Sequence, residues 1–171
     1  SSLLAHVVFL SPVRRKFRKH IEECRLGRKS LWPYGISGDM PMVVSFVRGK
    51  DDDDFVELLA DAHRYLRVKG ISCDFVFIAN DPPGYFKPVQ EMIMKVLSSG
   101  HMLPWLNQRG GFFIVSKASL SHDAANLFIN AARIVLDSGK GAVWEQLRYH
   151  SEVVYADISD PYINGCRPLP A

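Results

Sequence analysis

The 171-residue sequence has little of what marks secreted, zinc-binding or membrane-spanning proteins. Its three cysteines, Cys24, Cys73 and Cys166, are an odd number without Cys-x-x-Cys or Cys/His spacing, so the sequence supports neither a disulfide framework nor a zinc site. The longest apolar runs, such as Phe75–Ala79, are far too short to span a bilayer. We therefore expect a cytoplasmic protein whose chain does not insert into the membrane.

The sequence also lacks an initiator Met and a basic stretch followed by an apolar core near its start. We expect no signal peptide, and we interpret the missing Met as the sign of a fragment of a longer chain. An apolar fraction of 47% and a charged fraction of 23% are ordinary for a globular domain, and the length suffices for one such domain.

Positive charge is concentrated near the start of the chain, although the net charge is only +3. Residues 12–30 hold eight lysines and arginines against Glu22 and Glu23, so this segment carries +6 and the remainder −3. Such segments bind nucleic acid or anionic lipid in other proteins, and an anion-binding interaction module is one alternative. Apolar residues at helical spacing favour instead a solvated helix face, without a nucleic-acid partner. They are Val13, Phe17, Ile21 and Cys24.

Apolar runs and amphipathic segments alternate from residue 42 onward, which predicts an α/β fold with a small parallel sheet of about three strands and flanking helices. Continuous apolar runs indicate buried strands at Met42–Arg48, Cys73–Ala79 and Phe112–Ser116. Apolar residues three and four apart indicate helices between Phe55 and Leu66, Val89 and Leu97, and Ala124 and Val135, with a short fourth helix at Val143–Tyr149.

This pattern divides the chain into three parts. We expect an N-terminal helical segment at residues 1–30, the α/β module at residues 31–150, and an extended tail at residues 151–171. Parallel sheets bind ligands beyond the carboxyl ends of their strands. The segments at those ends have no Gly-x-Gly-x-x-Gly or Gly-x-x-x-x-Gly-Lys-Ser/Thr pattern, so we expect no nucleotide cofactor.

Four consecutive aspartates, Asp51–Asp54, follow the first expected strand. Asp51 and Asp53, with Asp81 after the second strand, would suit Mg²⁺ or Mn²⁺ in a metal-dependent sugar-nucleotide or phosphate-handling enzyme, because hard cations prefer carboxylate oxygens. The same run would also cap the helix that follows, since carboxylates at a helix N-terminus accept free N–H bonds and interact favourably with the helix dipole. We favour capping, and expect no bound metal.

Asp81 and Tyr85 belong to the segment Asn80–Tyr85, whose two prolines and glycine are typical of a turn. The two side chains are also a candidate catalytic or sugar-binding pair. The histidines of the module have no neighbouring nucleophile or metal cluster, and we expect structural or solvent-facing roles for His63, His101 and His122.

The stretch Leu31–Met40, LWPYGISGDM, places a glycine-rich loop just before the first strand. Ser37 between two glycines is superficially similar to a nucleophile elbow, but that motif needs a strand before it and a helix after it. We therefore interpret the stretch as a tight turn in which Gly35 and Gly38 adopt unusual φ angles. No catalytic residue is assigned.

The other side chains of this stretch have supporting roles in the same interpretation. Trp32 and Tyr34 would pack under the sheet, and Ser37 and Asp39 would cap local N–H groups. Because aromatic rings beside an aspartate also hold sugars, a contact with a sugar or with another domain is an alternative for these four residues.

The stretch Leu31–Pro41 resembles the Leu-Trp-x-x-Gly-Ile-Ser-Gly-Asp-Leu-Pro sequence of cyclic β-1,2-glucan synthases and their cellobiose-phosphorylase-like relatives. The resemblance extends over about residues 25 to 147. It includes the lead-in Arg25–Ser30, the helix segment Ala62-His63-Arg64-Tyr65 with Lys69-Gly70, the strand Asp74–Asn80 and the strand Gly110–Val115. The chain departs from the family pattern at Arg64, where a Glu is expected, and in the longer acidic run.

The resemblance implies a segment of a large bacterial multidomain glucan synthase or phosphorylase. In such proteins this stretch looks like the connector between a carbohydrate-binding β-sandwich and a helical-barrel catalytic domain. The family's catalytic aspartate lies in a Trp-Asn-Asp type motif that this sequence lacks. We therefore expect a fragment that is inactive alone. Its partners would be the other domains of a glycosyltransferase or phosphorylase, which binds β-glucan and is associated with the inner membrane.

Overall fold

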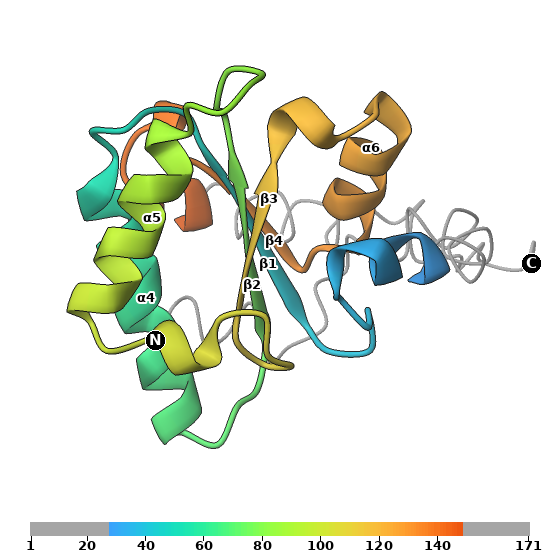
Figure 1. Ribbon diagram of the computed structural model, residues 1–171. Helices are drawn as coiled ribbons and strands as arrows, with labels where there is room; N and C mark the ends of the chain where they lie inside the picture. The colour runs from blue at the N-terminus through green and yellow to red at the C-terminus, as the bar shows by residue number, and fades with distance from the viewer. Residues whose placement is uncertain (1–27, 149–171) are drawn as a thin grey trace, which may run out of the picture.

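The computed structural model describes residues 28–148. The expected N-terminal helices, most of the basic segment and the expected extended tail lie outside the described residues. Within them, four parallel strands form one sheet in the order β3-β2-β1-β4, with helices on both faces (Figure 1). The strands are β1 (Met42–Val47), β2 (Asp74–Ala79), β3 (Phe112–Ser116) and β4 (Ile134–Asp137). The predicted α/β class is confirmed.

Each face of the sheet has its own apolar core. Helices α4 (Asp53–Val68) and α5 (Pro88–Ser99) cover one face, and α6 (His122–Ala131) covers the other together with the 3-10 helix η1 (Arg28–Tyr34). Alternate residues of a strand point to opposite faces, so Val43 packs toward α4 and α5 while its neighbour Val44 packs toward η1 and α6. In the register, Val44 lies beside Val76 of β2 and Val135 of β4.

Strand β4 corrects the sequence interpretation, in which one helix continued to Val135. The chain becomes extended at Ala132, and the backbone N–H of Arg133 donates to the carbonyl of Met42 at 2.7 Å. The run Ile134-Val135-Leu136 then pairs with β1. A short apolar run of this kind suits a buried helix or a buried strand equally, and the free edge of β1 decides the outcome here.

The segment before β1 is a second correction. Leu31 and Ile36 are the residues that η1 and the following turn bury under the sheet, whereas Trp32 is 60% exposed. Tyr34 is half-buried, and its ring meets that of Phe128 edge to face with 5.3 Å between centroids. The prediction that Trp32 packs under the sheet is therefore wrong.

Short helical turns complete the fold. They are η2 (Leu103–Trp105), η3 (Lys117–Ser119) and η4 (Ser138–Lys140), and a further helix starts at residue 143 and continues to the end of the described part, residue 148. The start of the short fourth helix is thus confirmed. The turn interpretation of the glycine-rich stretch is also confirmed, because Gly35 and Gly38 have φ angles of 76° and 72°.

Candidate functional site

The carboxyl edge of the sheet, by which we mean the side where the parallel strands end, is where an α/β fold of this type places a ligand. After β3 the chain returns past β2 and β1 to β4, so the ends of β1 and β4 flank the point at which the strand order reverses. Arg48 and Asp137 meet there: Arg48 Nε donates to Asp137 Oδ1 at 2.6 Å, and Arg48 Nη2 donates to Oδ2 at 2.7 Å. A bidentate ion pair between Arg48 and Asp137 therefore spans the crevice.

This ion pair fixes the charge of both side chains. Hydrogen bonding to Arg48 holds the pKa of Asp137 below its ordinary value, and the backbone N–H of Gly139 adds to the effect against the desolvation of the carboxylate. Asp137 in turn raises the pKa of Arg48. Asp137 is thus ionised at neutral pH, with both of its oxygens engaged, which is the wrong state for a general acid.

Asp52 occupies the small nest of donors next to this pair. Its Oδ2 accepts from the backbone N–H of Arg48 at 3.1 Å, from the N–H of Gly49 at 2.9 Å, and from the hydroxyl of Ser138 at 2.5 Å. Converging backbone N–H groups of this kind bind anions in many α/β proteins. Here the anion is the carboxylate of the module itself, so the most favourable place for a phosphate is filled from within.

The hydrogen-bonded capping of α4 that we expect from the aspartate run is not found at Asp52. Asp52 stands at the N-cap position of α4, yet its side chain makes no capping bond to the helix and instead bonds back to the preceding loop. Asp53 and Asp54 lie in the first turn, where carboxylates interact favourably with the helix dipole. Within residues 28–148, no three or more His, Cys, Asp or Glu side chains are arranged to hold a metal ion.

Asp81 has a capping role on the neighbouring helix. It is buried, and its two oxygens accept from the backbone N–H groups of Val89 at 2.7 Å and Gln90 at 3.1 Å, at the start of α5. These bonds satisfy donors that a helix start leaves free. Tyr85, in the same turn, is fully exposed. The two candidates of one turn thus lie in opposite environments.

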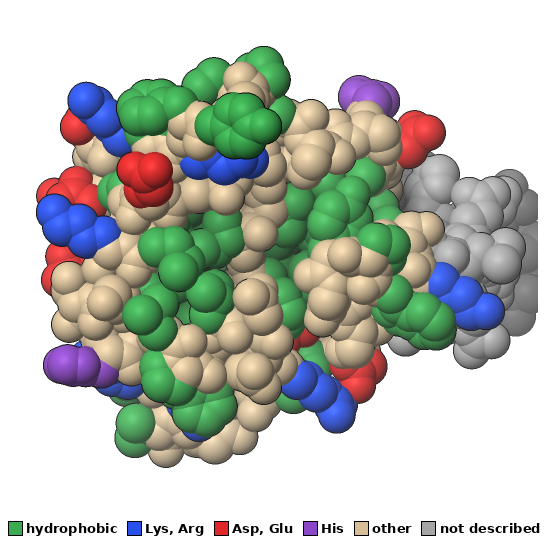
Figure 2. Space-filling view, viewed as in Figure 1, with side chains coloured by type: hydrophobic (Ala, Val, Ile, Leu, Met, Phe, Trp, Pro, Cys, Tyr) green, Lys and Arg blue, Asp and Glu red, His purple; other side chains and the backbone are tan. Residues whose placement is uncertain are grey.

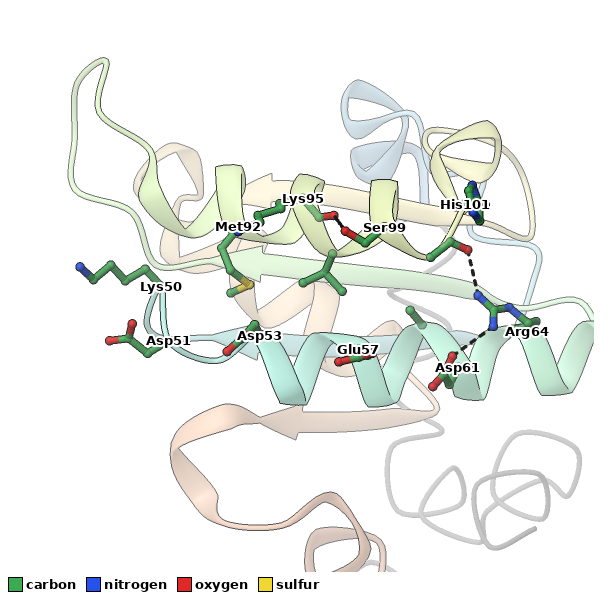
Figure 3. Close-up of a pocket in the computed structure, with 13 residues that line it drawn as sticks. Lys50, Asp51, Asp53, Glu57, Asp61, Arg64, Met92, Lys95, Ser99 and His101 are labelled. Atoms are coloured by element: carbon green, nitrogen blue, oxygen red, sulfur yellow. Dashed lines mark hydrogen bonds and ion pairs between the residues drawn. The ribbon is translucent and has the colours of Figure 1, made fainter.

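A groove of about 780 Å³ separates α4 from α5 (Figure 3). Carboxylates follow one another along its α4 wall, and Lys95 faces them from α5. Arg64 closes one end by donating to the carbonyl of Gly100 at 2.8 Å. The acidic members of the lining are Asp51, Asp53, Glu57 and Asp61. Both charge signs line the groove, which suits a polar polypeptide surface better than a single anion or cation.

The amino edge of the sheet, where the parallel strands begin, holds a second, buried polar cluster around the backbone of Gly110. The N–H of Gly110 donates to Asp74 Oδ1 at 2.7 Å, while its carbonyl lies 2.7 Å from His63 Nε2. A carbonyl only accepts, so Nε2 carries the proton. His63 also packs edge to face on Phe75, with 5.2 Å between ring centroids. The backbone of one residue, Gly110, is thus held from α4 and from β2 at once.

Burial shifts both titratable groups of this cluster toward their neutral forms. It lowers the pKa of His63 against the opposing bond to Gly110, and the nearby Arg67 lowers it further. Burial likewise raises the pKa of Asp74. His63 Nδ1 and Asp74 Oδ2 are buried without a hydrogen-bond partner in the structure. The expectation of structural or solvent-facing roles is confirmed, because His63 is buried in this cluster while His101 and His122 are exposed.

The glycine-rich stretch reaches the same edge. Asp39 forms an ion pair with Arg109, the residue before Gly110, and Ser37 donates to the other oxygen of Asp39. Arg67 covers the ring of Trp105 in the same loop, with 3.1 Å from its guanidinium carbon to the ring centroid. Ser37 is therefore placed beside a carboxylate of an ion pair, without the base that a nucleophile needs.

Sequence reasoning missed Arg48, Ser138 and Asp137 as a group. Their signal is weak, because Asp137-Ser138-Gly139 is a polar turn that follows an apolar run whose spacing predicts a helix as far as Val135. Their proximity follows only from the pairing of β4 with β1, which joins residues about ninety positions apart. Once β4 is assigned as a strand, its carboxyl end is expected to lie where α/β folds bind ligands.

The described residues form an α/β module with an all-parallel sheet. Its carboxyl edge is occupied by the side chains of Arg48, Asp52 and Asp137. The chain is 24% identical over 150 residues to the cyclic beta-(1,2)-glucan synthase NdvB of Rhizobium meliloti (strain 1021), a distant relationship that covers 83% of this chain and 5% of the relative. The chain thus spans about one twentieth of the length of the curated relative that it matches. No protein-family model matches it. Within residues 28–148, none of the helices has the length and apolar character needed to cross a membrane.

Proposed function

We propose that this chain is a non-catalytic α/β accessory module of a bacterial cyclic β-1,2-glucan synthase or a related β-glucan phosphorylase. The whole protein would transfer or phosphorolyse β-glucosyl units, and the module would position neighbouring domains. The relationship to the Rhizobium meliloti synthase supports the protein class, and the small share of that relative that is covered supports the role of a part.

The observation that carries the non-catalytic role is the closed carboxyl edge. Arg48 and Asp137 span the crevice, and Asp52 fills the donor nest beside them. A substrate or nucleotide at this edge would have to break these charge-assisted bonds before binding. A positioning role needs no such opening, because domain contacts use the outer surfaces of the module.

Binding titrations and an activity assay test the role. The 171-residue chain, mixed with Mg²⁺, with a nucleotide sugar or with inorganic phosphate, is expected to give no binding heat at micromolar affinity. The full polypeptide that contains it is expected to form β-1,2-linked glucan or to phosphorolyse it. Micromolar binding by the isolated chain would contradict the accessory role, and a full polypeptide without activity on β-glucan would contradict the protein class.

The two alternatives remain separable from this proposal. A metal-dependent enzyme using Asp51, Asp53 and Asp81 predicts that Mn²⁺ raises the melting temperature and that Asp51→Ala abolishes the rise. Its geometric basis is weak, because Asp81 bonds to α5 with both oxygens. An anion-binding module predicts salt-dependent binding of the chain to nucleic acid or to acidic vesicles.

A further inference from the structure

The loop between β2 and α5, residues 80–87, displays two adjacent aromatic side chains in solvent. Tyr85 is fully exposed and Phe86 is 69% exposed. Hydrophobic atoms gather at the top of the space-filling view (Figure 2), where this loop rises beyond the sheet in Figure 1. Single exposed apolar residues are normal, but burial of two neighbouring aromatic rings is strongly favourable and marks a contact surface.

The loop is built to hold these rings outward. Both oxygens of Asp81 are bonded to the start of α5, which anchors one end of the loop. Pro82, Pro83 and Pro88 restrict its backbone, and Gly84 takes a φ of 124° that other residues avoid. A stiff loop loses little conformational entropy when its side chains become buried in a contact. The display is therefore pre-organised for binding.

The surroundings of the rings favour a protein partner over a sugar. An aromatic platform for a sugar needs polar side chains beside it to bond the sugar hydroxyls. The only carboxylate of the loop, Asp81, is buried and engaged with α5. Asn80 bonds back to the carbonyl of Arg48. Lys87 is the only other charged side chain of this loop, and one lysine offers few of the bonds that the hydroxyls of a carbohydrate need. The exposed part of the loop therefore matches an apolar protein pocket better than a sugar.

We infer that Tyr85 and Phe86 form a docking knob that inserts into an apolar pocket on another domain of the same polypeptide. This inference rests on the proposed function, under which the module is about one twentieth of a long chain, as it is of its relative. Two rings are too small a surface to hold a separate protein. A covalently attached domain is present at a high effective concentration, so the same small surface suffices.

Photo-crosslinking in the full polypeptide tests the knob. The crosslinking amino acid p-benzoylphenylalanine replaces Tyr85 in one variant and Val68 in the control, because Val68 is 79% exposed at the far end of α4. After illumination, mass spectrometry identifies the joined peptides. We expect position 85 to join a segment outside residues 1–171 of the same polypeptide, with a yield about tenfold above position 68, as a contact favoured by one order of magnitude would give.

Each other outcome overturns the inference. No crosslink above the control means that the rings stay in solvent. A crosslink to residues 1–27 or 149–171 means that this chain covers its own knob, and a crosslink between two polypeptides means self-association. If the polypeptide makes β-1,2-glucan while position 85 gives no such crosslink, the docking knob fails and the proposed function stands. If crosslinking occurs in a polypeptide without activity on β-glucan, the proposed function fails instead.

Discussion

The two edges of the sheet are closed by different chemistry. At the carboxyl edge, Arg48 and Asp137 form an ion pair in which the arginine side chain is 60% exposed. At the amino edge, His63 and Asp74 hold the carbonyl and the N–H of Gly110, and both side chains have almost no exposure to water. The carboxyl edge is thus closed by charged groups at the surface. The opposite edge is closed by buried groups whose shifted pKa values favour their neutral forms.

The segments that resemble glucan synthases supply residues of the amino edge. Three of these separated segments contribute His63, Asp74 and Gly110, and the first two bind the backbone of the third. A fourth, the glycine-rich stretch, contributes Asp39, which pairs with Arg109 beside it. The motifs therefore describe how the amino edge is assembled, far from the edge where an α/β fold binds ligands.

The largest effect is expected from Gly111→Ala, which breaks the amino edge. A Cβ at this position would overlap the carbonyl oxygen of Trp105 and lie 2.9 Å from that of Gln108, and backbone atoms cannot move aside cheaply. We expect urea unfolding of the chain to show a loss of about 3 kcal/mol or more. Gly70→Ala is the matched control.

The control separates crowding from backbone strain. Gly70 has a φ of 76°, but an added Cβ would meet nothing within 4 Å, so only about 1 kcal/mol of strain is expected. If the two variants lose the same stability, the loop before β3 is not packed as tightly as the structure shows.

Asp74→Ala comes next, because it removes a buried acceptor and keeps the donor. The N–H of Gly110 would be left without a partner, which costs about 1–3 kcal/mol by urea unfolding. Asp74→Asn keeps an acceptor oxygen, and burial already disfavours the charge of Asp74, so this variant is expected to stay near wild type. Equal losses in both variants would mean that the amino edge depends on charge, which would break the comparison.

Much of this architecture could be predicted from the sequence. The continuous apolar runs predict β2 and β3 closely, and the three-and-four spacing predicts α4 and α5, because those elements bury regular faces. The sequence pattern does not distinguish β4 from a helix, because its four residues form a strand only by pairing with β1. Local pattern carries no information about that long-range contact.

The candidate sites were less predictable for the same reason. Sequence reasoning singled out Asp51, Asp53 and Asp81 as carboxylates near strand ends, but which of them are buried depends on loop geometry. Asp52, their unremarked neighbour, receives the three hydrogen bonds of the nest. For His63 the sequence leaves a structural and a solvent-facing role open, and the structure buries it. Its partner Gly110 lies 47 residues away, so local pattern does not indicate this contact.

A pH series on His63→Gln sharpens the buried side of the comparison. Burial lowers the pKa of His63 below the value of about 6.5 that the unfolded chain has, so its neutral form stabilises the fold fully above that pH. As pH falls from 7 toward the folded pKa, the unfolded state takes up the proton first and stability is lost, by at most about 1.4 kcal/mol per pH unit.

Glutamine still offers an N–H to Gly110 but does not titrate. The difference in unfolding free energy between wild type and His63→Gln is therefore expected to shift against wild type from pH 7 to pH 5, measured by urea unfolding at each pH. Asp74 is present in both proteins, so its opposite trend largely cancels. A difference independent of pH would show that His63 is not held neutral.

Asp137→Asn gives the smallest effect and tests the exposed side. Because the Arg48 side chain is 60% exposed, we expect about half the stability loss of Asp74→Ala or less in urea unfolding at pH 7, and a further reduction in 1 M NaCl, where ions screen surface pairs.

The same variant has a pH dependence. The bond to Arg48 lowers the pKa of Asp137, so its stabilisation is present above the unfolded pKa of about 3.9 and is lost as pH falls through the folded pKa. Wild type and variant should converge in that acidic range. The stability loss caused by Asp74→Ala, which removes a buried hydrogen bond, should be the same with and without salt. A salt-dependent loss in Asp74→Ala, or a salt-independent loss in Asp137→Asn, would contradict the contrast between the two edges.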